Sequence, residues 1–294
     1  MQKSFYLFFL FFFFLLYGCS SAPPTVALLT DYGAQDHYVA QLQGVILSIN
    51  PKVRLVHITH EVPTYDIRQG SFMLATAAGD FPRGTIFVAV VDPDVGSKRK
   101  AIIVETLDQK YFVGPDNGLF TDVIRTLGVK RAFEITNLLW YRTSAISSTF
   151  HGRDVFAPAA AHLSKGKKVE EAGPPIADLQ KFQRTEAVLS GGTIRGEILH
   201  CDRYGNLITN IHATVLAKAG WKNGMTFDFK IRSQIARAKF SDRYNAVAPG
   251  EYVVLLNSHG LLEIARNLAN AASPLGAASG DTVEVLTSGK TATN

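Results

Sequence analysis

The sequence lacks the charge pattern that marks a nucleic-acid-binding surface. Only 19% of its 294 residues are charged, and 30 lysines and arginines against 25 acidic residues give a net charge of +5. The excess is spread thinly, with no run of five basic residues, so we expect no nucleic-acid partner. A hydrophobic content of 47% is typical of a folded globular protein rather than a disordered chain.

Cysteine is scarce as well, and the longest apolar run is short. The run Phe5–Tyr17 has 13 residues, whereas a membrane-spanning helix needs about 20. It follows Lys3 and ends just before Gly18 and Cys19, which resembles a bacterial lipoprotein signal. We therefore expect a signal peptide over residues 1–18, lipidation of Cys19, a tether over 19–24, and an exported protein anchored on the periplasmic side of a bacterial membrane. An uncleaved anchor and an ordinary export signal are the alternatives.

Lipidation of Cys19 would leave Cys201 as the only free thiol, so no intramolecular disulfide is expected. The chain is well above the size at which small domains need disulfides, and its fold must depend on its hydrophobic core.

The patterns that would identify a phosphate loop or a metal centre are also missing. No Gly-Lys-Ser/Thr run occurs, which argues against a phosphate-binding loop. His57, His60 and Glu61 are metal-ligand types at close spacing. Because a strand sends alternate residues to opposite faces, the two histidines need not converge. We expect neither a metal nor a cofactor.

Residues 25 to about 165 alternate strand-like and helix-like segments, which predicts an α/β domain with a largely parallel sheet between helices. The expected strands are 25–29, 53–58 and 85–91, and the expected helices are 36–49, capped by Asp36, and 66–78.

After about residue 187 the pattern changes to short strands between glycine, asparagine and proline turns. The expected strands are 194–200, 207–211, 226–231, 252–256 and 282–286, with helical signal at 214–219 and 262–271. This predicts a smaller, mostly antiparallel, β-barrel-like domain. The expected division is an α/β domain over 25–172, a linker over 173–187 and a β domain over 188–294.

Two acidic residues stand where strands of the α/β domain are expected to end. Asp31 follows the first strand, and Asp92 follows the third, ahead of a basic segment that contains Arg99. Ligands of open α/β sheets bind outside the carboxyl ends of the strands. Aspartate at a strand end also caps turns, so position alone leaves both interpretations open.

A second polar stretch precedes the apolar helix expected at 155–163. Arg153 and Asp154 fit a structural role at its start. His151, which stands before Gly152, is a poor helix cap and is a candidate for the wall of a polar site.

Seven motifs then occur in order along the chain: LLTDYG (28–33), HEVPTYDIRQG (60–70), VVDPDVGSKR (90–99), VGPDNGL (113–119), TFHGRDVFAPAAAHL (149–163), DRYGNLITNI (202–211) and LLNSHGLLEIARN (255–267). Together they resemble the S-adenosylmethionine hydrolases that release adenosine, which are relatives of the fluorinating and chlorinating enzymes. The resemblance covers roughly residues 25 to 287.

The resemblance implies that water attacks the 5′ carbon of S-adenosylmethionine, giving adenosine and L-methionine. It places the catalytic set on Asp92, Arg99 and His151. The sulfonium is already a good leaving group, so what the enzyme must supply is an in-line water and acceptors for its proton. Asp92 and His151 would accept from that water, and Arg99 would fix the carboxylate.

The resemblance also places substrate contacts on both domains. Asp31 would hold the ribose hydroxyls, Tyr65 would form an aromatic wall, and the backbone near Leu268 would read the adenine edge. The other implied contacts are Asp202 and Asn206 at the methionine ammonium, with Ser258, Glu263 and Arg266 also lining the site. In this family the β domain of one subunit completes the site of the next, which implies a homotrimer.

Two residues depart from the family pattern, and two other functions stay open. Asp94 stands where the family usually has glycine, which puts a second carboxylate near Asp92, and His259 is also unexpected. Halogenating relatives carry an aromatic residue at the position of Asp92 and a hydroxyl near Gly152. A lipid-anchored nucleoside-binding protein without turnover is the other alternative.

Overall fold

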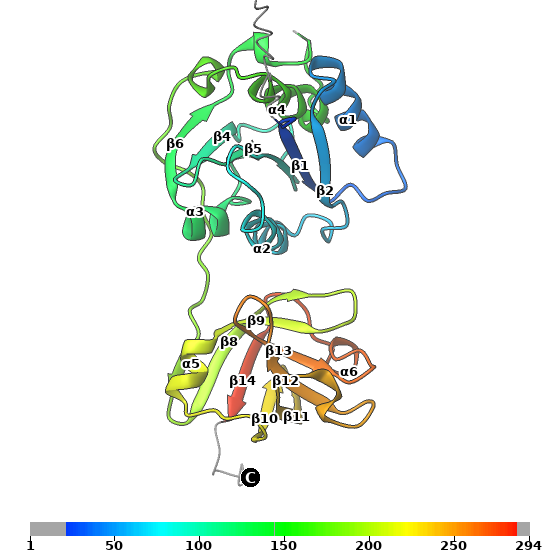
Figure 1. Cartoon of the computed structure of the whole chain (residues 1–294), viewed down its shortest axis with the longest axis vertical. Helices are drawn as coiled ribbons and strands as arrows, with labels where there is room; N and C mark the ends of the chain where they lie inside the picture. The colour runs from blue at the N-terminus through cyan, green and yellow to red at the C-terminus, as the bar shows by residue number, and fades with distance from the viewer. Residues whose placement is uncertain (1–21, 144, 287–294) are drawn as a thin grey trace, which may run out of the picture.

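The computed structural model describes residues 22–143 and 145–286, which form two domains (Figure 1). The N-terminal domain is a six-stranded, largely parallel sheet between helices, and the C-terminal domain is a closed, mostly antiparallel β-barrel. The fold class predicted from the sequence is confirmed.

The sheet of the N-terminal domain has the strand order β2-β1-β3-β5-β4-β6. Its strands are β1 (Thr25–Thr30), β2 (Arg54–Thr59), β3 (Ile86–Val90), β4 (Ala101–Thr106), β5 (Tyr111–Pro115) and β6 (Val129–Glu134). The pairs β1–β2, β1–β3 and β3–β5 are parallel, whereas β4 runs antiparallel to both β5 and β6. The carboxyl ends of β1 and β3 therefore lie side by side at one edge of the sheet.

Two helices cover each face of this sheet. They are α1 (Tyr38–Ile49) and α4 (Ala157–Ser164) on one face, and α2 (Ile67–Ala78) and α3 (Thr121–Leu127) on the other. Alternate residues of β1 enter the two cores: Val26 and Leu28 pack with the first pair of helices, Ala27 and Leu29 with the second. A strand covered on both faces needs an apolar residue at every position, which explains the continuous apolar run.

The two predicted helix starts have different outcomes. Asp66 caps α2 as its side chain accepts a hydrogen bond from the backbone N–H of Gln69 at 2.8 Å. The cap predicted for the first helix is wrong. Helix α1 begins at Tyr38 after His37, without a side-chain cap, and Asp36 lines a cavity instead.

The barrel consists of seven strands, with β7 added outside β8. Its elements are β7 (Val188–Ser190), β8 (Thr193–Cys201), β9 (Leu207–His212), α5 (Ala213–Lys218), β10 (Thr226–Ile231), β11 (Gln234–Phe240), β12 (Tyr252–Leu256), β13 (Leu261–Arg266), α6 (Ala272–Leu275) and β14 (Thr282–Leu286). The order is β14-β10-β11-β12-β13-β9-β8, and pairing of β14 with β8 closes the ring. Among the barrel strands that the structure describes, only β11 and β12 pair in parallel.

The helical signal predicted at 262–271 is wrong. Strand β13 pairs with β12 and β9, and Leu262 and Ile264 alternate into the barrel core. The segment contains residues with good helix propensity, but Gly260 turns the chain at φ +71° so that β13 folds back on β12. Tertiary pairing thus overrides a weak local preference.

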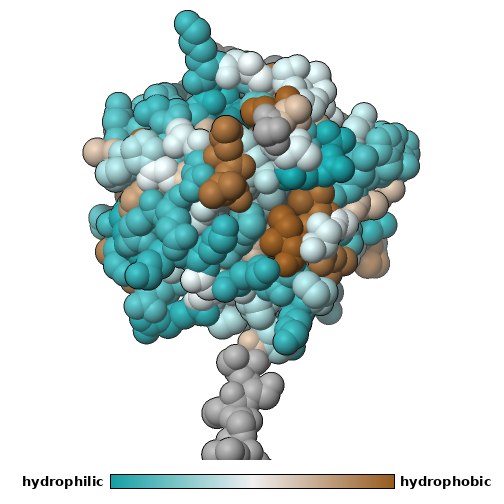
Figure 2. All heavy atoms as spheres, turned by 90° about the horizontal axis from the view of Figure 1, so that it is seen from above, coloured by the Kyte–Doolittle hydropathy of each residue, from teal (hydrophilic) through white to brown (hydrophobic). Residues whose placement is uncertain are grey.

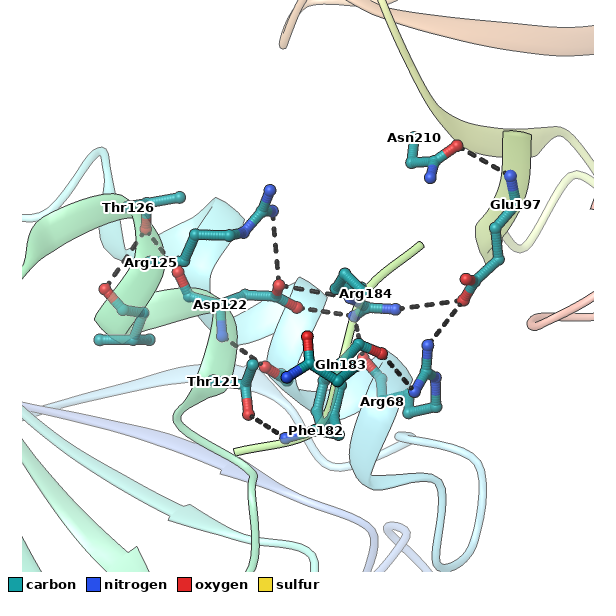
Figure 3. Close-up of polar contacts among 12 residues, drawn as sticks. Arg68, Thr121, Asp122, Arg125, Thr126, Phe182, Gln183, Arg184, Glu197 and Asn210 are labelled. Atoms are coloured by element: carbon teal, nitrogen blue, oxygen red, sulfur yellow. Dashed lines mark hydrogen bonds and ion pairs between the residues drawn. The ribbon is translucent and has the colours of Figure 1, made fainter. Parts of the chain in front are cut away.

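A cluster of ion pairs joins the two domains (Figure 3). Arg184 lies in the segment between them, and its side chain is only 6% exposed. Its Nη2 donates to Asp122 of α3 at 2.6 Å, and its Nη1 lies 3.6 Å from Glu197 of β8. Arg68 of α2 reaches the same Glu197 at 3.0 Å. The barrel is therefore held against the α2–α3 side of the sheet by a shared, mostly buried network of charges.

The end of the molecule formed by the N-terminal domain is mostly hydrophilic, with separate apolar patches (Figure 2). Large exposed apolar side chains of this domain include Leu138, Leu139 and Ile146. None of the helices within residues 22–143 and 145–286 combines the length and apolar character that crossing a bilayer requires.

Candidate active site

A cavity of about 650 Å³ opens at the carboxyl ends of β1 and β3. Its polar lining includes Asp31, Asp92 and His151, and its aromatic lining includes Tyr32 and Tyr38. A cavity thus lies at the predicted position beyond the strand ends, and the structure brings residues from four separate motifs into it.

Asp92 and Arg99 form an almost fully buried ion pair at this cavity. Arg99 Nε donates to Asp92 Oδ1 at 2.8 Å, and Nη2 donates to Oδ2 at 2.5 Å. The two side chains are 4% and 7% exposed. A two-point contact of this kind fixes the plane of the carboxylate as well as its position.

His151 joins this pair through a contact that determines its tautomer. Arg99 Nη2 lies 2.8 Å from His151 Nδ1. Because a guanidinium can only donate, Nδ1 must be the acceptor, so the hydrogen of the neutral ring is on Nε2. Burial and the adjacent Arg99 charge lower the pKa of His151, which favours the neutral ring.

A glycine allows the two loops of this set to approach each other. Gly96 has φ +81°, and a Cβ at this position would lie 2.3 Å from the carbonyl oxygen of Ser148. A side chain would therefore separate the loop of Asp92 and Arg99 from the loop that carries His151. The glycine of the VVDPDVGSKR motif thus has a steric explanation.

His151 precedes a π-helical turn, Gly152–Phe156, which continues into α4. Such turns are rare and are often found at functional sites. Asp154 within it is 2% exposed and accepts from Arg153 Nε at 2.7 Å and from the backbone N–H of Ser147 at 2.9 Å. Asp154 therefore anchors the loop before His151, as expected for a structural residue.

Asp31 and Tyr65 meet across the mouth of the cavity. The backbone N–H of Tyr65 donates to Asp31 Oδ2 at 3.1 Å. Burial raises the pKa of the Asp31 carboxyl, and the hydrogen bond from Tyr65 opposes this shift. Tyr65 is 66% exposed and has φ +65°, which is strained for a residue with a side chain. An exposed aromatic held in a strained conformation is typical of a functional site.

His57 and His60, which strand alternation does not require to converge, contact each other in the structure. His57 Nδ1 lies 2.6 Å from His60 Nε2, and His60 Nδ1 lies 2.8 Å from the hydroxyl of Thr30, next to Asp31. Burial and His57 lower the pKa of His60 to about 4. No group of three or more histidine, cysteine or acidic side chains in the described part of the chain could hold a metal ion.

A second cavity of about 650 Å³ lies on the barrel. It is lined by four residues predicted from the sequence: Asp202, Asn206, Arg266 and Leu268. Leu268 is 88% exposed and has φ +54°, the same combination as Tyr65. Among the described residues, the two cavities share no lining residue.

The Asp202 carboxylate orders the turn of this second cavity. It accepts from the backbone N–H groups of Tyr204 at 2.9 Å and Asn206 at 2.8 Å, and from the Asn206 side chain at 2.9 Å. A carboxylate has room for about four such bonds, so a ligand ammonium can still be accommodated.

The remaining predicted residues of the barrel have different positions. Glu263 is buried and accepts from the hydroxyl of Tyr244, which lines the cavity, at 2.8 Å. The Arg266 guanidinium donates to the carbonyls of Gly250 and Asn270. Ser258 does not line the second cavity; it lies at the turn between β12 and β13, beside His259.

Asp94 does not have the conformation that would favour glycine. It is exposed, and it is not among the described non-glycine residues with positive φ. It does not line the cavity that contains Asp92. The departure from the family pattern therefore causes no backbone strain.

Apart from Tyr65, the aromatic residues of both cavities were missed by sequence reasoning. Tyr32 follows Asp31 directly, Tyr204 lies within the motif of Asp202, and Tyr244 belongs to no quoted motif. Proximity to the motif acids was the available signal for the first two. Tyr244 gave none, because its neighbour Glu263 is 19 residues away in the chain.

Two family models match the chain. The N-terminal domain of SAM hydroxide adenosyltransferases matches residues 26–173, and the C-terminal domain of the same family matches residues 196–284.

Each alignment with a relative covers most of this chain and nearly all of the relative. A protein from Methanocaldococcus jannaschii named (R)-S-adenosyl-L-methionine hydrolase is 34% identical over 89% of this chain and 95% of its own. A fluorinase from an Actinoplanes species is 30% identical over 89% of this chain and 97% of its own. The crystal structure of an uncharacterized conserved protein from Thermotoga maritima is 36% identical, with a TM-score of 0.86 over 89% of this chain and 99% of its own.

These comparisons correct the predicted localisation. The relatives that match about nine-tenths of the chain include proteins named as hydrolases of S-adenosylmethionine and as fluorinases, and none of these is named as a lipoprotein. The prediction of a signal, a lipid anchor and a position at a membrane is therefore wrong. It depended on a few residues around Cys19, whereas the comparison depends on about nine-tenths of the chain. Residues 1–18 and Cys19 lie outside the described residues.

The ordered motifs, the two-domain fold and the matches to both domains agree with one another. The chain belongs to the SAM hydroxide adenosyltransferase family.

Proposed function

We propose that this protein hydrolyses S-adenosyl-L-methionine to adenosine and L-methionine, with Asp92, Arg99 and His151 positioning the attacking water. The observation that carries the proposal is the contact of Arg99 with both Asp92 and His151, the latter two of which line one cavity. Relatives named as (R)-S-adenosyl-L-methionine hydrolases support the reaction.

In this proposal Asp92 is the proton acceptor. The water oxygen attacks the 5′ carbon, the carbon–sulfur bond breaks, and its electron pair leaves with methionine as a neutral thioether. One proton of the water passes to the Asp92 carboxylate, which Arg99 holds in place. With Nδ1 facing Arg99, His151 presents Nε2–H and therefore donates to the water oxygen rather than accepting from it.

The cavity suits a reaction in which positive charge is dispersed. The sulfonium charge disappears as the bond breaks, so a site with little water favours the transition state over the charged substrate. The rings of Tyr32, Tyr38 and Phe150 contact one another edge to face, with centroids 5.3 to 5.9 Å apart. Their faces can also attract a sulfonium cation in the bound substrate. These steps use only protein groups and water.

The substrate contacts are proposed to come from two chains. Residues 25–172 would supply Asp31 and Tyr65, residues 173–187 would be the linker, and the β domain from residue 188 would supply the other half. Separate cavities without a common residue, and exposed apolar residues at both, support a site completed by a second copy in a homotrimer.

In that second half, Asp202 and Asn206 would bind the methionine ammonium. The backbone near Leu268, held by Arg266, would bind the adenine edge. Glu263, and Ser258 from the turn between β12 and β13, would complete the lining.

Halogenation fits the same cavity less well. A halide in the nucleophile position would face the Asp92 carboxylate, which repels an anion. Gly152 has no hydroxyl to replace water around the halide. Of the two reactions carried out by named relatives, the residues favour hydrolysis.

The reaction is tested by incubating the purified protein with S-adenosylmethionine in ¹⁸O-labelled water. We expect adenosine that carries one ¹⁸O atom at its 5′ hydroxyl, measured by mass spectrometry. Saturable binding of added adenosine, without release of labelled adenosine from S-adenosylmethionine, would instead support a nucleoside-binding protein. A chloride-dependent 5′-chloro product would support a halogenase.

A mixing experiment tests the shared site. Asp92→Asn and Asp202→Asn chains, each inactive when refolded alone, are unfolded together and refolded. In a ring in which neighbours share a site, random mixing restores both halves in roughly a quarter of the sites, so about a quarter of the wild-type activity is expected. If mixing restores nothing, the two half-sites do not combine between chains.

A further inference from the structure

Tyr32 occupies space that a side chain at position 152 would otherwise fill. A Cβ placed on Gly152 would lie 2.5 Å from the Tyr32 hydroxyl oxygen and 3.4 Å from its Cζ. Contacts under 3.0 Å are essentially never seen for a real Cβ. The glycine next to His151 and the tyrosine next to Asp31 are therefore sterically coupled, although 120 residues separate them in the chain.

The ring of Tyr32 is held in one orientation, and its hydroxyl remains available. Tyr38 and Phe150 contact the ring edge to face, with centroids 5.9 and 5.8 Å away. The hydroxyl makes no hydrogen bond to any other residue that the structure describes. Tyr32 lines the cavity together with Asp92 and His151. Burial and the nearby carboxylates of Asp31 and Asp92 raise the pKa of the phenol, so the group stays protonated.

The proposed water lacks one hydrogen-bond acceptor. A water that attacks with one lone pair has two hydrogens and one further lone pair to place. Asp92 accepts one hydrogen, and His151 Nε2–H donates to the remaining lone pair. Both nitrogens of His151 are then engaged, since Nδ1 already accepts from Arg99. The second hydrogen of the water needs another acceptor in the cavity.

We infer that the Tyr32 hydroxyl is this acceptor, so that Tyr32 is a further nucleophile-positioning residue. This inference rests on the proposed function. Tyr32 supplies, from the end of β1, a hydroxyl at the place where a serine at position 152 would present one. Its oxygen accepts from the water, and its own hydrogen stays free for the substrate. No bond of Tyr32 is made or broken in the reaction.

The test is a swap of the hydroxyl between the two positions. Tyr32→Phe keeps the ring and removes the hydroxyl, and we expect kcat to fall about tenfold with KM within about twofold, the effect of one hydrogen bond made at the transition state. Adding Gly152→Ser to Tyr32→Phe returns a hydroxyl to the same space, where the new Cβ is 3.4 Å from the ring carbon. The double variant should recover at least threefold of the loss. Gly152→Ser alone should lose activity, because Tyr32 already fills that space.

Tyr111→Phe is the matched control. Tyr111 is a half-buried tyrosine of β5 outside the cavity, and its variant should keep wild-type kcat. Wild-type kcat in Tyr32→Phe would overturn the inference while leaving the proposed hydrolysis intact. A fall that serine at 152 does not reverse would also overturn it, since the role would then be structural. A wild-type protein that releases no adenosine would overturn the proposed function together with this inference.

Discussion

Asp92→Asn is expected to lower kcat for S-adenosylmethionine hydrolysis by about 10³-fold, with a much smaller change in KM. Asparagine keeps the shape of the side chain, and its oxygen can still accept from Arg99. It cannot take a proton from the attacking water, and the charge that Arg99 neutralises is lost. Because the Asp92 carboxylate acts on the attacking water rather than on the bound substrate, the substitution should lower mainly kcat and change KM little. Steady-state release of adenosine measures both constants.

Asp94→Asn is the control for that variant. It makes the same chemical change two residues away in the same turn, at an exposed side chain outside the cavity. Its kcat should equal that of the unmodified protein. If Asp92→Asn keeps activity within about fivefold, Asp92 is not the proton acceptor. If Asp94→Asn alters kcat as strongly, the acidic turn acts as a whole rather than through Asp92.

The layered fold could be predicted because its cause is local. Strand β3 is apolar at every position and β1 at every position between its two end threonines, since each packs against helices on both faces, and such runs are visible in the sequence. The antiparallel edge formed by β4 and β6 and the change of β13 from helix-like sequence to strand were not visible. They depend on pairing between segments far apart in the chain, and local propensity carries no information about such pairing.

The candidate site divides in the same way. The acids at the ends of β1 and β3 could be located from strand position alone, and the motifs identified Arg99 and His151. Contacts between motifs could not be predicted from the sequence. That Arg99 fixes the tautomer of His151, or that Tyr32 fills the space beside Gly152, follows only from distances across the fold.

Arg184→Met is the second prediction with a large expected effect, and it acts on stability. Arg184 is buried between two carboxylates, Asp122 at 2.6 Å and Glu197 at 3.6 Å (Figure 3). Methionine fills a similar volume without charge, so both carboxylates lose their most buried cation. Breaking a buried pair in this way costs about 3 to 5 kcal/mol. Arg68 and Arg125 still contact the two acids, which places the expected loss near 3 kcal/mol.

The loss should appear as a lower midpoint in urea unfolding followed by circular dichroism. Arg237→Met is the control: Arg237 pairs with Asp228 at 2.8 Å on the surface of the barrel, 72% exposed, and its loss should leave the midpoint unchanged. Adding Asp122→Asn to Arg184→Met should restore part of the stability, since one of the two buried carboxylates that lost Arg184 is then neutral. If Arg184→Met unfolds at the wild-type midpoint, the junction does not depend on this ion pair, and the apolar contacts between the domains must hold the barrel in place. If the double variant is less stable than Arg184→Met, the loss comes from packing around residue 184 rather than from buried charge that lost its arginine.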